Sequence, residues 1–161
     1  MTVRVLFVCL GNICRSPTAH GVFQAMVDAQ GLGERVWVDS AGTAAWHEGK
    51  APDPRSSDFA ARRGYDLSQL RARQAIAEDF SRFDYILAMD SENLSNLKQL
   101  QPTDGGAQLD LLLSYADGIE RTDVPDPYYG NGQGFDLVLD LIENACAHLL
   151  VRIKEERGLS C

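Results

Sequence analysis

Two side chains near the start of the chain could act together on an anion. Cys9 and Arg15 lie six positions apart within residues 8–17 (VCLGNICRSP). A thiol next to a cation and a helix N-terminus ionises readily and is then a strong nucleophile. A guanidinium offers a planar pair of N–H donors that matches two phosphate oxygens. The two side chains therefore indicate nucleophilic chemistry on a phosphate or a similar anion.

The spacing of Cys9 and Arg15 is by itself a weak motif, because buried structural cysteines are common and the pattern can arise by chance. The residues around them strengthen it. Gly11 and Asn12 tolerate the unusual backbone φ angles of a tight turn, and Ser16 places a hydroxyl where it could donate to a thiolate. A turn with a purely structural role would need neither the thiol nor the guanidinium.

A strand and a helix are expected on either side of this turn. Residues 3–8 form an apolar run that is broken only by Arg4, and the apolar residues after the turn recur at helical spacing. Ser16 is expected to cap the helix and Pro17 to fill its first position. Backbone N–H groups then converge on the turn at the positive end of the helix, a geometry that binds anions.

The rest of the chain alternates between strand and helix patterns. Further strands are expected at residues 35–39, 83–89 and 108–113, helices at 55–63, 73–78, 91–99 and 135–156, and loops at 40–54 and 114–134. This alternation predicts an α/β fold, a flavodoxin-like doubly wound sheet of four parallel strands with helices on both faces. Ligands bind such sheets at the carboxyl ends of the strands, where the turn after the first strand lies.

Five short motifs together resemble the low-molecular-weight protein tyrosine phosphatases. They are residues 9–17 (CLGNICRSP), 39–42 (DSAG), 52–55 (PDPR), 83–87 (FDYIL) and 126–130 (DPYYG). The resemblance spans nearly the whole chain. It implies hydrolysis of phosphotyrosine in proteins, and of small aryl phosphates, through a cysteinyl-phosphate intermediate without a cofactor or metal.

The resemblance also assigns roles to individual residues. It implies that Cys9 is the nucleophile, Arg15 the phosphate clamp and Asp126 the general acid and base; without it, Asp126-Pro127 would be interpreted as turn chemistry. Trp46, Tyr128 and Tyr129 would form aromatic walls around the substrate ring. The substrate-binding residues that it implies are Leu10, Gly11, Asn12, Ile13, Cys14, Ser16, Trp46, Tyr128 and Tyr129.

Several residues have two interpretations at this stage. In the family, Cys14 can form a reversible disulfide with the nucleophile, but it can equally be a small loop residue. Many vertebrate members place a histidine near position 70, where this chain has Leu70, so a hydrogen-bond network behind the loop is in question. Cys146 is expected in the core. The three histidines, His20, His47 and His148, are expected on the surface.

Two other classes of function remain to be compared with the phosphatase. An arsenate reductase of the same fold needs further cysteines to relay a disulfide, and residues 75–100, where that family keeps its pair, contain none. A non-enzymatic phosphate-binding module would need neither the thiol of Cys9 nor the carboxyl of Asp126.

Composition and charge further narrow the class of protein to which the chain can belong. The 161 residues fit a single domain, 1–161, and the net charge of −8 disfavours a nucleic-acid partner. No apolar run is long enough to cross a membrane, and the start is too short for a signal peptide. The four cysteines do not form a disulfide or zinc pattern. We therefore expect a cytoplasmic protein with reduced thiols and no metal, monomeric or weakly self-associating, that acts on phosphotyrosine-containing proteins.

Overall fold

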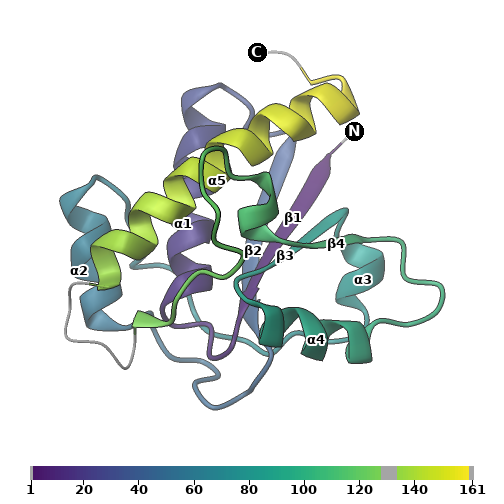
Figure 1. The fold of residues 1–161 in the computed structure, drawn as a ribbon, viewed down its shortest axis with the longest axis horizontal. Helices are drawn as coiled ribbons and strands as arrows, with labels where there is room; N and C mark the ends of the chain where they lie inside the picture. The colour runs from purple at the N-terminus through teal and green to yellow at the C-terminus, as the bar shows by residue number, and fades with distance from the viewer. Residues whose placement is uncertain (1, 128–133, 160–161) are drawn as a thin grey trace.

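Four parallel strands form the sheet at the centre of the molecule. The computed structural model describes residues 2–127 and 134–159. The strands are β1 (Val3–Cys9), β2 (Val36–Gly42), β3 (Tyr85–Ala88) and β4 (Gln108–Leu111), and they lie in the order β2-β1-β3-β4 (Figure 1). The strand order reverses at β1, which pairs with β2 on one side and β3 on the other. The predicted flavodoxin-like α/β fold is confirmed.

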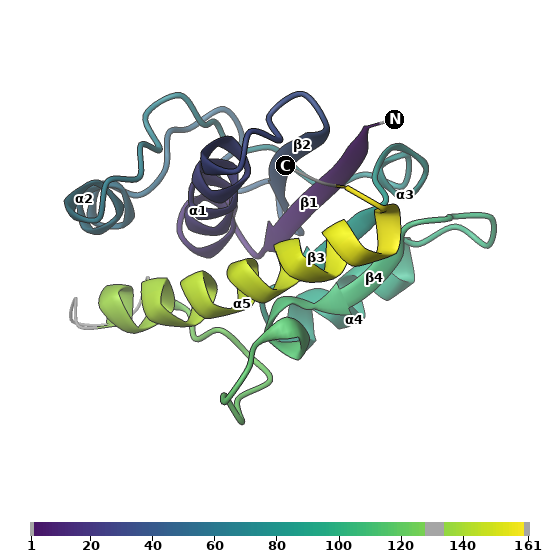
Figure 2. The ribbon, with the colours of Figure 1, turned by 90° about the horizontal axis from the view of Figure 1, so that it is seen from above.

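Helices cover both faces of this sheet. One face packs against α1 (Arg15–Ala29), α5 (Gly134–Arg157) and the 3-10 turn η1 (Leu112–Tyr115). The other face packs against α3 (Asp79–Arg82) and α4 (Ser91–Leu100), as Figure 2 shows. The remaining helix, α2 (Pro54–Arg62), lies outside α1 and α5 and contacts both.

The apolar run of β1 follows from its central position. Val5 and Phe7 enter the core under α1 and α5, while Leu6 and Val8 enter the core under α3 and α4. All four side chains have no exposed surface. A strand that is buried on both faces has an almost continuous apolar sequence, whereas a half-exposed strand alternates. Burial on both sides therefore holds the end of β1, and Cys9 with it, in one place.

The helix predicted at residues 73–78 is wrong. The segment runs extended beside the end of β2, where the Gly42 amide donates to the Arg73 carbonyl (2.8 Å) and the Ala75 amide donates to the Gly42 carbonyl (2.7 Å). Because these groups bond across to β2, they cannot bond within a helix. The short helix α3 begins only at Asp79. Strand β2 continues to Gly42, beyond its predicted end, because its last residues pair with the last residues of β1.

None of the helices in the described part of the chain is long and apolar enough to cross a membrane.

Candidate active site

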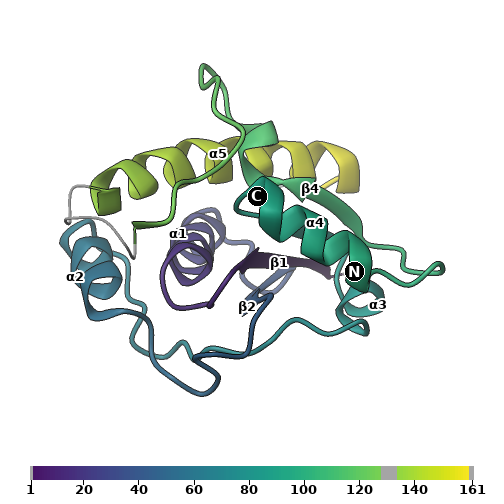
Figure 3. The same ribbon diagram turned by 60° about the horizontal axis from the view of Figure 1, so that its bottom comes forward.

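Three segments meet at the carboxyl ends of the strands. Figure 3 shows the turn after β1 between the loop that follows β2 and the segment that leads into α5. We call residues 9–16 the phosphate loop and residues 116–127 the acid segment. These segments and the loop after β2 enclose a pocket, which is lined by Cys9, Leu10, Gly11, Ile13, Cys14, Arg15, Trp46, His47 and Asp126. The switch point of the sheet thus carries the pocket, as the strand pattern predicts.

The phosphate loop turns sharply at Asn12. Its φ is +57°, and among the described non-glycine residues only Asn12 has a positive φ. Asparagine enters this left-handed region more readily than most residues. Helix α1 begins at Arg15 with Cys14 at the N-cap position, so the prediction that Ser16 caps the helix and Pro17 fills its first position is wrong. The hydroxyl of Ser16 contacts other segments instead of its own helix N-terminus.

The sulfur of Cys9 lies among hydrogen-bond donors. The backbone N–H of Asn12 donates to Sγ (3.3 Å), and the Ser16 hydroxyl lies 3.0 Å from it. Asn12 Nδ2 donates to the same hydroxyl (2.8 Å). Cys9 is 3% exposed, yet it lines the pocket. The sulfur is therefore held in a fixed position where donors can stabilise a negative charge.

Arg15 is almost fully buried and is held by groups of segments distant in sequence. Its Nη1 donates to Asp90 Oδ2 (2.6 Å) and to the Val124 carbonyl (2.9 Å), and Nη2 lies 3.6 Å from Asp126 Oδ2. Burial opposes the charged form, but the charges of Cys9, Asp90 and Asp126 outweigh it and raise the pKa of the Arg15 guanidinium. Arg15 therefore remains a cation of fixed orientation.

Asp90 was not predicted as a site residue, although the sequence contains a signal for it. It directly follows the strand region of β3 and caps α4, where its Oδ1 accepts from the Asn93 amide (2.7 Å). Its second oxygen, Oδ2, accepts a hydrogen bond from Nη1 of Arg15. A carboxylate at the carboxyl end of a strand that neighbours β1 is placed close to the turn after β1.

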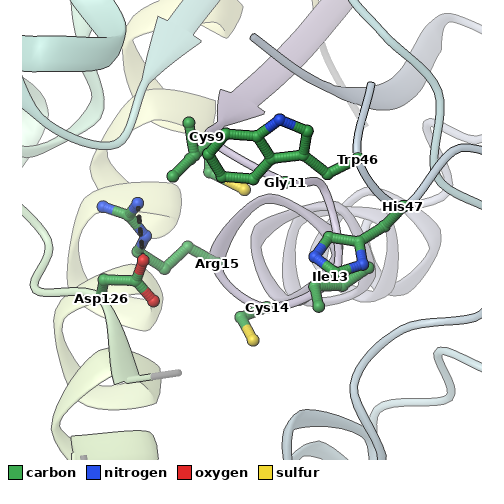
Figure 4. Close-up of a pocket in the computed structure, with 9 residues that line it drawn as sticks. Cys9, Gly11, Ile13, Cys14, Arg15, Trp46, His47 and Asp126 are labelled. Carbon is green, nitrogen blue, oxygen red and sulfur yellow. Dashed lines mark ion pairs between the residues drawn. The ribbon is translucent and has the colours of Figure 1, made fainter. Parts of the chain in front are cut away.

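Asp126 and Arg15 lie side by side in the pocket wall, where the dashed line in Figure 4 marks their ion pair. Its side chain is 29% exposed, against 4% for the side chain of Arg15. The acid segment is attached nearby, where the Val124 amide donates to the Met89 carbonyl (2.7 Å) and Asp123 accepts from the Ser91 hydroxyl (2.8 Å). Asp126 therefore reaches the pocket from a segment that is held at a few points.

The two pocket thiols differ in environment. Cys14 is 5% exposed, and burial raises its pKa to about 12, although a hydrogen bond with Ser56 acts in the opposite direction. It is therefore a neutral thiol near neutral pH. Cys146 lies in the core of α5, as predicted, and burial raises its pKa as well. Of these three thiols, Cys9 combines a pocket-lining sulfur with two neighbouring donor groups, the Asn12 backbone N–H and the Ser16 hydroxyl.

Two aromatic rings form the wall opposite Arg15 and Asp126 (Figure 4). Trp46 lines the pocket with 67% of its surface exposed, and its role as an aromatic wall for the substrate stays a prediction. His47 was expected on the surface, but it also lines the pocket and packs against Gly11, where an added Cβ would lie 2.9 Å from the His47 ring. Its position next to Trp46 in the sequence was the available signal.

Asn12 and Ser16 bond to the sulfur from behind the pocket wall. His20 is half-buried and lies 3.2 Å from the Ser40 hydroxyl, so its predicted surface position is wrong, whereas His148 is exposed. Tyr128 and Tyr129 lie outside the described residues. Within residues 2–127 and 134–159, no group of three His, Cys, Asp or Glu side chains could hold a metal ion.

Comparisons with known proteins agree on one family. A family model for low molecular weight phosphotyrosine protein phosphatases matches residues 4–159. A low molecular weight protein-tyrosine-phosphatase of Streptomyces coelicolor is 46% identical over 159 residues, which are 97% of this chain and 96% of that protein. The low molecular weight phosphotyrosine protein phosphatase of Homo sapiens is 44% identical over 151 residues, 92% and 94% of the two chains. The crystal structure of a protein tyrosine phosphatase from Entamoeba histolytica matches with a TM-score of 0.92 at 38% identity and covers 97% of this chain and 99% of that chain.

Proposed function

The chain belongs to the low molecular weight phosphotyrosine protein phosphatase family and is therefore a protein-tyrosine phosphatase; we propose that it works through a cysteinyl-phosphate intermediate formed on Cys9. One observation carries the proposal. A buried sulfur with two donors, a fixed guanidinium and a carboxyl group line the same pocket. These are the nucleophile, the anion clamp and the proton donor that hydrolysis of an aryl phosphate requires.

In the first step, the Cys9 thiolate attacks phosphorus and the tyrosine oxygen leaves. The phosphoryl oxygens accept hydrogen bonds from the backbone N–H groups of the phosphate loop and from the guanidinium of Arg15. Asp90 and the Val124 carbonyl hold Arg15 through Nη1. Because the clamp is already oriented, little reorganisation is needed as charge moves onto the phosphoryl oxygens.

Asp126 supplies the proton for the leaving oxygen, whose conjugate acid has a pKa of about 10. In the free enzyme the carboxyl group of Asp126 lies 3.6 Å from Nη2 of Arg15. A substrate dianion takes over the Arg15 donors and repels the carboxylate, so substrate binding favours the protonated form. The proton is then available next to the phenolate that forms.

In the second step, water attacks the phosphorus of the cysteinyl phosphate and the sulfur leaves as a thiolate. Asp126, now a carboxylate, takes a proton from that water. The Ser16 hydroxyl and the backbone N–H of Asn12, which lie 3.0 and 3.3 Å from the sulfur, donate to the negative charge that returns to the sulfur. Inorganic phosphate and the starting form of the enzyme result.

The other two classes of function agree less well with the pocket. A relay of disulfides, as in an arsenate reductase, needs exposed and reactive thiols, and in the described part of the chain the other thiol that lines the pocket is Cys14, which burial keeps protonated. A phosphate-binding module gives no reason for the carboxyl of Asp126 beside the clamp.

Substitution of the nucleophile tests the proposal directly. Cys9→Ser should lose at least about a thousandfold in turnover of p-nitrophenyl phosphate, yet still bind phosphate, because Arg15 and the N–H groups remain. Cys146→Ala, a change of a core thiol, should keep its turnover. Substantial hydrolysis by purified Cys9→Ser would remove Cys9 from this role.

Oxidation is a second property that we propose for this site. Peroxide would convert the Cys9 thiolate to a sulfenic acid, and the Cys14 thiol would then displace water from it to form a disulfide. Since burial raises the pKa of Cys14 to about 12, this closure should be slow. Once formed, the disulfide protects the Cys9 sulfur from further oxidation, so brief peroxide treatment should cause a loss of activity that dithiothreitol restores in the native chain and restores less fully in Cys14→Ser. If the native chain and Cys14→Ser recover activity equally and mass spectrometry finds no cross-link between the two peptides, Cys14 has only a structural role in the loop.

A further inference from the structure

We propose that Arg73, anchored by Asp79, is a positioning residue that orients the Asn12 amide and thereby the two donors that serve the Cys9 thiolate. The inference rests on the proposed role of Cys9 as nucleophile. Arg73 does not line the pocket. It acts from the extended segment beside the end of β2.

A continuous chain of hydrogen bonds links Arg73 to the sulfur. The Arg73 backbone N–H donates to Asn12 Oδ1 (3.0 Å), Asn12 Nδ2 donates to the Ser16 hydroxyl oxygen (2.8 Å), and that oxygen lies 3.0 Å from Cys9 Sγ. A backbone N–H can only donate, so it holds the oxygen of the Asn12 amide on its own side. The amide nitrogen must then face Ser16.

This orientation determines what Ser16 can do. Its oxygen already accepts from Asn12, so its one proton is available either to Cys9 or to the Ala41 carbonyl, which lies 3.3 Å away. When Cys9 is a thiolate, the hydroxyl donates to sulfur. When the sulfur carries a proton or a phosphoryl group, the hydroxyl can turn to Ala41. The hydroxyl therefore follows the charge on sulfur through the reaction.

The hydrogen bond from Arg73 to Asn12 also supports the second donor to the sulfur, the backbone N–H of Asn12. Asn12 is 2% exposed and has a φ of +57°, and its backbone N–H donates to the sulfur. A side chain that is fixed at both ends of its amide holds the residue in this unusual conformation. Loosening the bond from Arg73 should therefore weaken both donors to Cys9.

The guanidinium of Arg73 holds its own backbone in place. It donates to both oxygens of Asp79 (3.1 and 3.2 Å) and also to Asp39 (3.2 Å). Asp79 is 1% exposed and accepts from the Ile76 amide as well (2.8 Å). The buried carboxylate thus links the side chain of Arg73 to the backbone three residues further on. This closed ring fixes the direction of the Arg73 N–H.

The test measures the ionisation of Cys9 without any substrate. Iodoacetamide reacts with the thiolate, so the alkylation rate at Cys9, followed by mass spectrometry across a pH series, reports how strongly its donors stabilise the charge. Arg73→Lys and Asp79→Asn should move the midpoint of this profile to higher pH by about one unit, which corresponds to roughly tenfold slower alkylation below the midpoint. Asp39→Asn, which leaves the ring with Asp79 intact, should move it less.

Arg63→Lys is the matched control. Arg63 pairs with three carboxylates of α5, Asp136, Asp140 and Glu143, and does not line the pocket. The Arg63→Lys variant should lower the thermal stability as Arg73→Lys does but leave the alkylation profile of Cys9 unchanged. An unchanged profile in folded Arg73→Lys, or an equal shift in Arg63→Lys, overturns the proposal. The alkylation rate at Cys9 does not depend on turnover, so the two proposals can fail separately. The catalytic proposal fails if Cys9→Ser remains active, and the positioning proposal fails if the alkylation profile does not move.

Discussion

The phosphate loop and the acid segment both contribute to one pocket, but they are held in different ways. In the phosphate loop, residues 12–16 are buried and bond to one another and to the neighbouring strands. In the acid segment, most residues before Val124 are exposed or half-exposed, and the attachments come from distant parts of the chain. The nucleophile and the clamp are therefore preorganised, while the acid keeps contact with water and can change its protonation state between the two steps.

Arg15 joins the two regions, so its loss should have the largest effect. Arg15→Lys keeps a charge but loses the paired donors to phosphate and the bond to the Val124 carbonyl. We expect kcat/KM for p-nitrophenyl phosphate to fall by about a thousandfold, as for loss of a main transition-state donor. The control is Arg62→Lys on the exposed surface of α2. A loss of less than tenfold in Arg15→Lys would contradict the bidentate clamp.

The acid segment can be tested alone through the basicity of the leaving group. Asp126→Ala should slow phenyl phosphate by roughly a hundredfold or more and p-nitrophenyl phosphate much less, because nitrophenolate leaves without a proton. Asp123→Asn, a change in the same segment outside the pocket, should reduce both substrates alike. The rates on the two substrates are compared at saturation. Equal losses of rate on the two substrates in Asp126→Ala would mean that Asp126 shapes the pocket but donates no proton.

The same small substitution made beside each region, at the end of β2 and at the start of α5, should separate rigid from tolerant backbone. A Cβ at Gly42 would lie 2.7 Å from the Leu10 carbonyl and 3.1 Å from the Asn12 amide, so Gly42→Ala must displace the phosphate loop. Overpacking of this kind corresponds to roughly tenfold weaker phosphate binding. Among the described residues, a Cβ at Gly134 would meet Pro127 alone, at 3.6 Å, and Gly134→Ala should bind phosphate normally. Competitive inhibition by phosphate measures both, and equal inhibition constants would refute a rigid loop.

Trp46 belongs to neither region and should affect binding more than chemistry. Stacking of an aromatic pair is worth about 0.5 to 1.5 kcal/mol beyond burial, so Trp46→Ala should raise KM for aryl phosphates by roughly two- to tenfold at nearly constant kcat. Trp46→Phe should restore part of this loss. An unchanged KM in Trp46→Ala would exclude it from the aromatic wall.

The smallest expected effect concerns the support behind the phosphate loop. Burial lowers the pKa of His20, although Asp39 acts in the opposite direction. Because the unfolded chain binds a proton more readily than the folded one, His20 lowers stability as the pH falls through about 6.5 and below. Thermal unfolding of His20→Gln should therefore depend less on pH between 7.5 and 5.5 than that of the native chain, whereas His148→Gln, on the exposed face of α5, should not differ from it.

The sequence alone predicted the features that depend on neighbouring residues. The apolar run of β1, the turn and helix that follow it and the pair of Cys9 and Arg15 all lie within residues 3–29, so local periodicity and turn chemistry were sufficient to place them. The alternation of strands and helices likewise predicted the parallel sheet and the end at which the pocket lies. Asp126 entered through the resemblance, since an Asp-Pro pair by itself indicates a turn.

The tertiary structure decided where backbone and side-chain groups find their partners when several are available. Residues 73–76 have a helical pattern, but they bond to Gly42 because the end of β2 offers unpaired groups. Ser16 has the properties of a helix cap, yet its hydroxyl bonds to a cysteine and an asparagine that the fold brings beside it. Asp90 and the Val124 carbonyl reach Arg15 from 75 and 109 positions away. Local propensity cannot predict such choices, because they depend on contacts that form only when distant segments pack together.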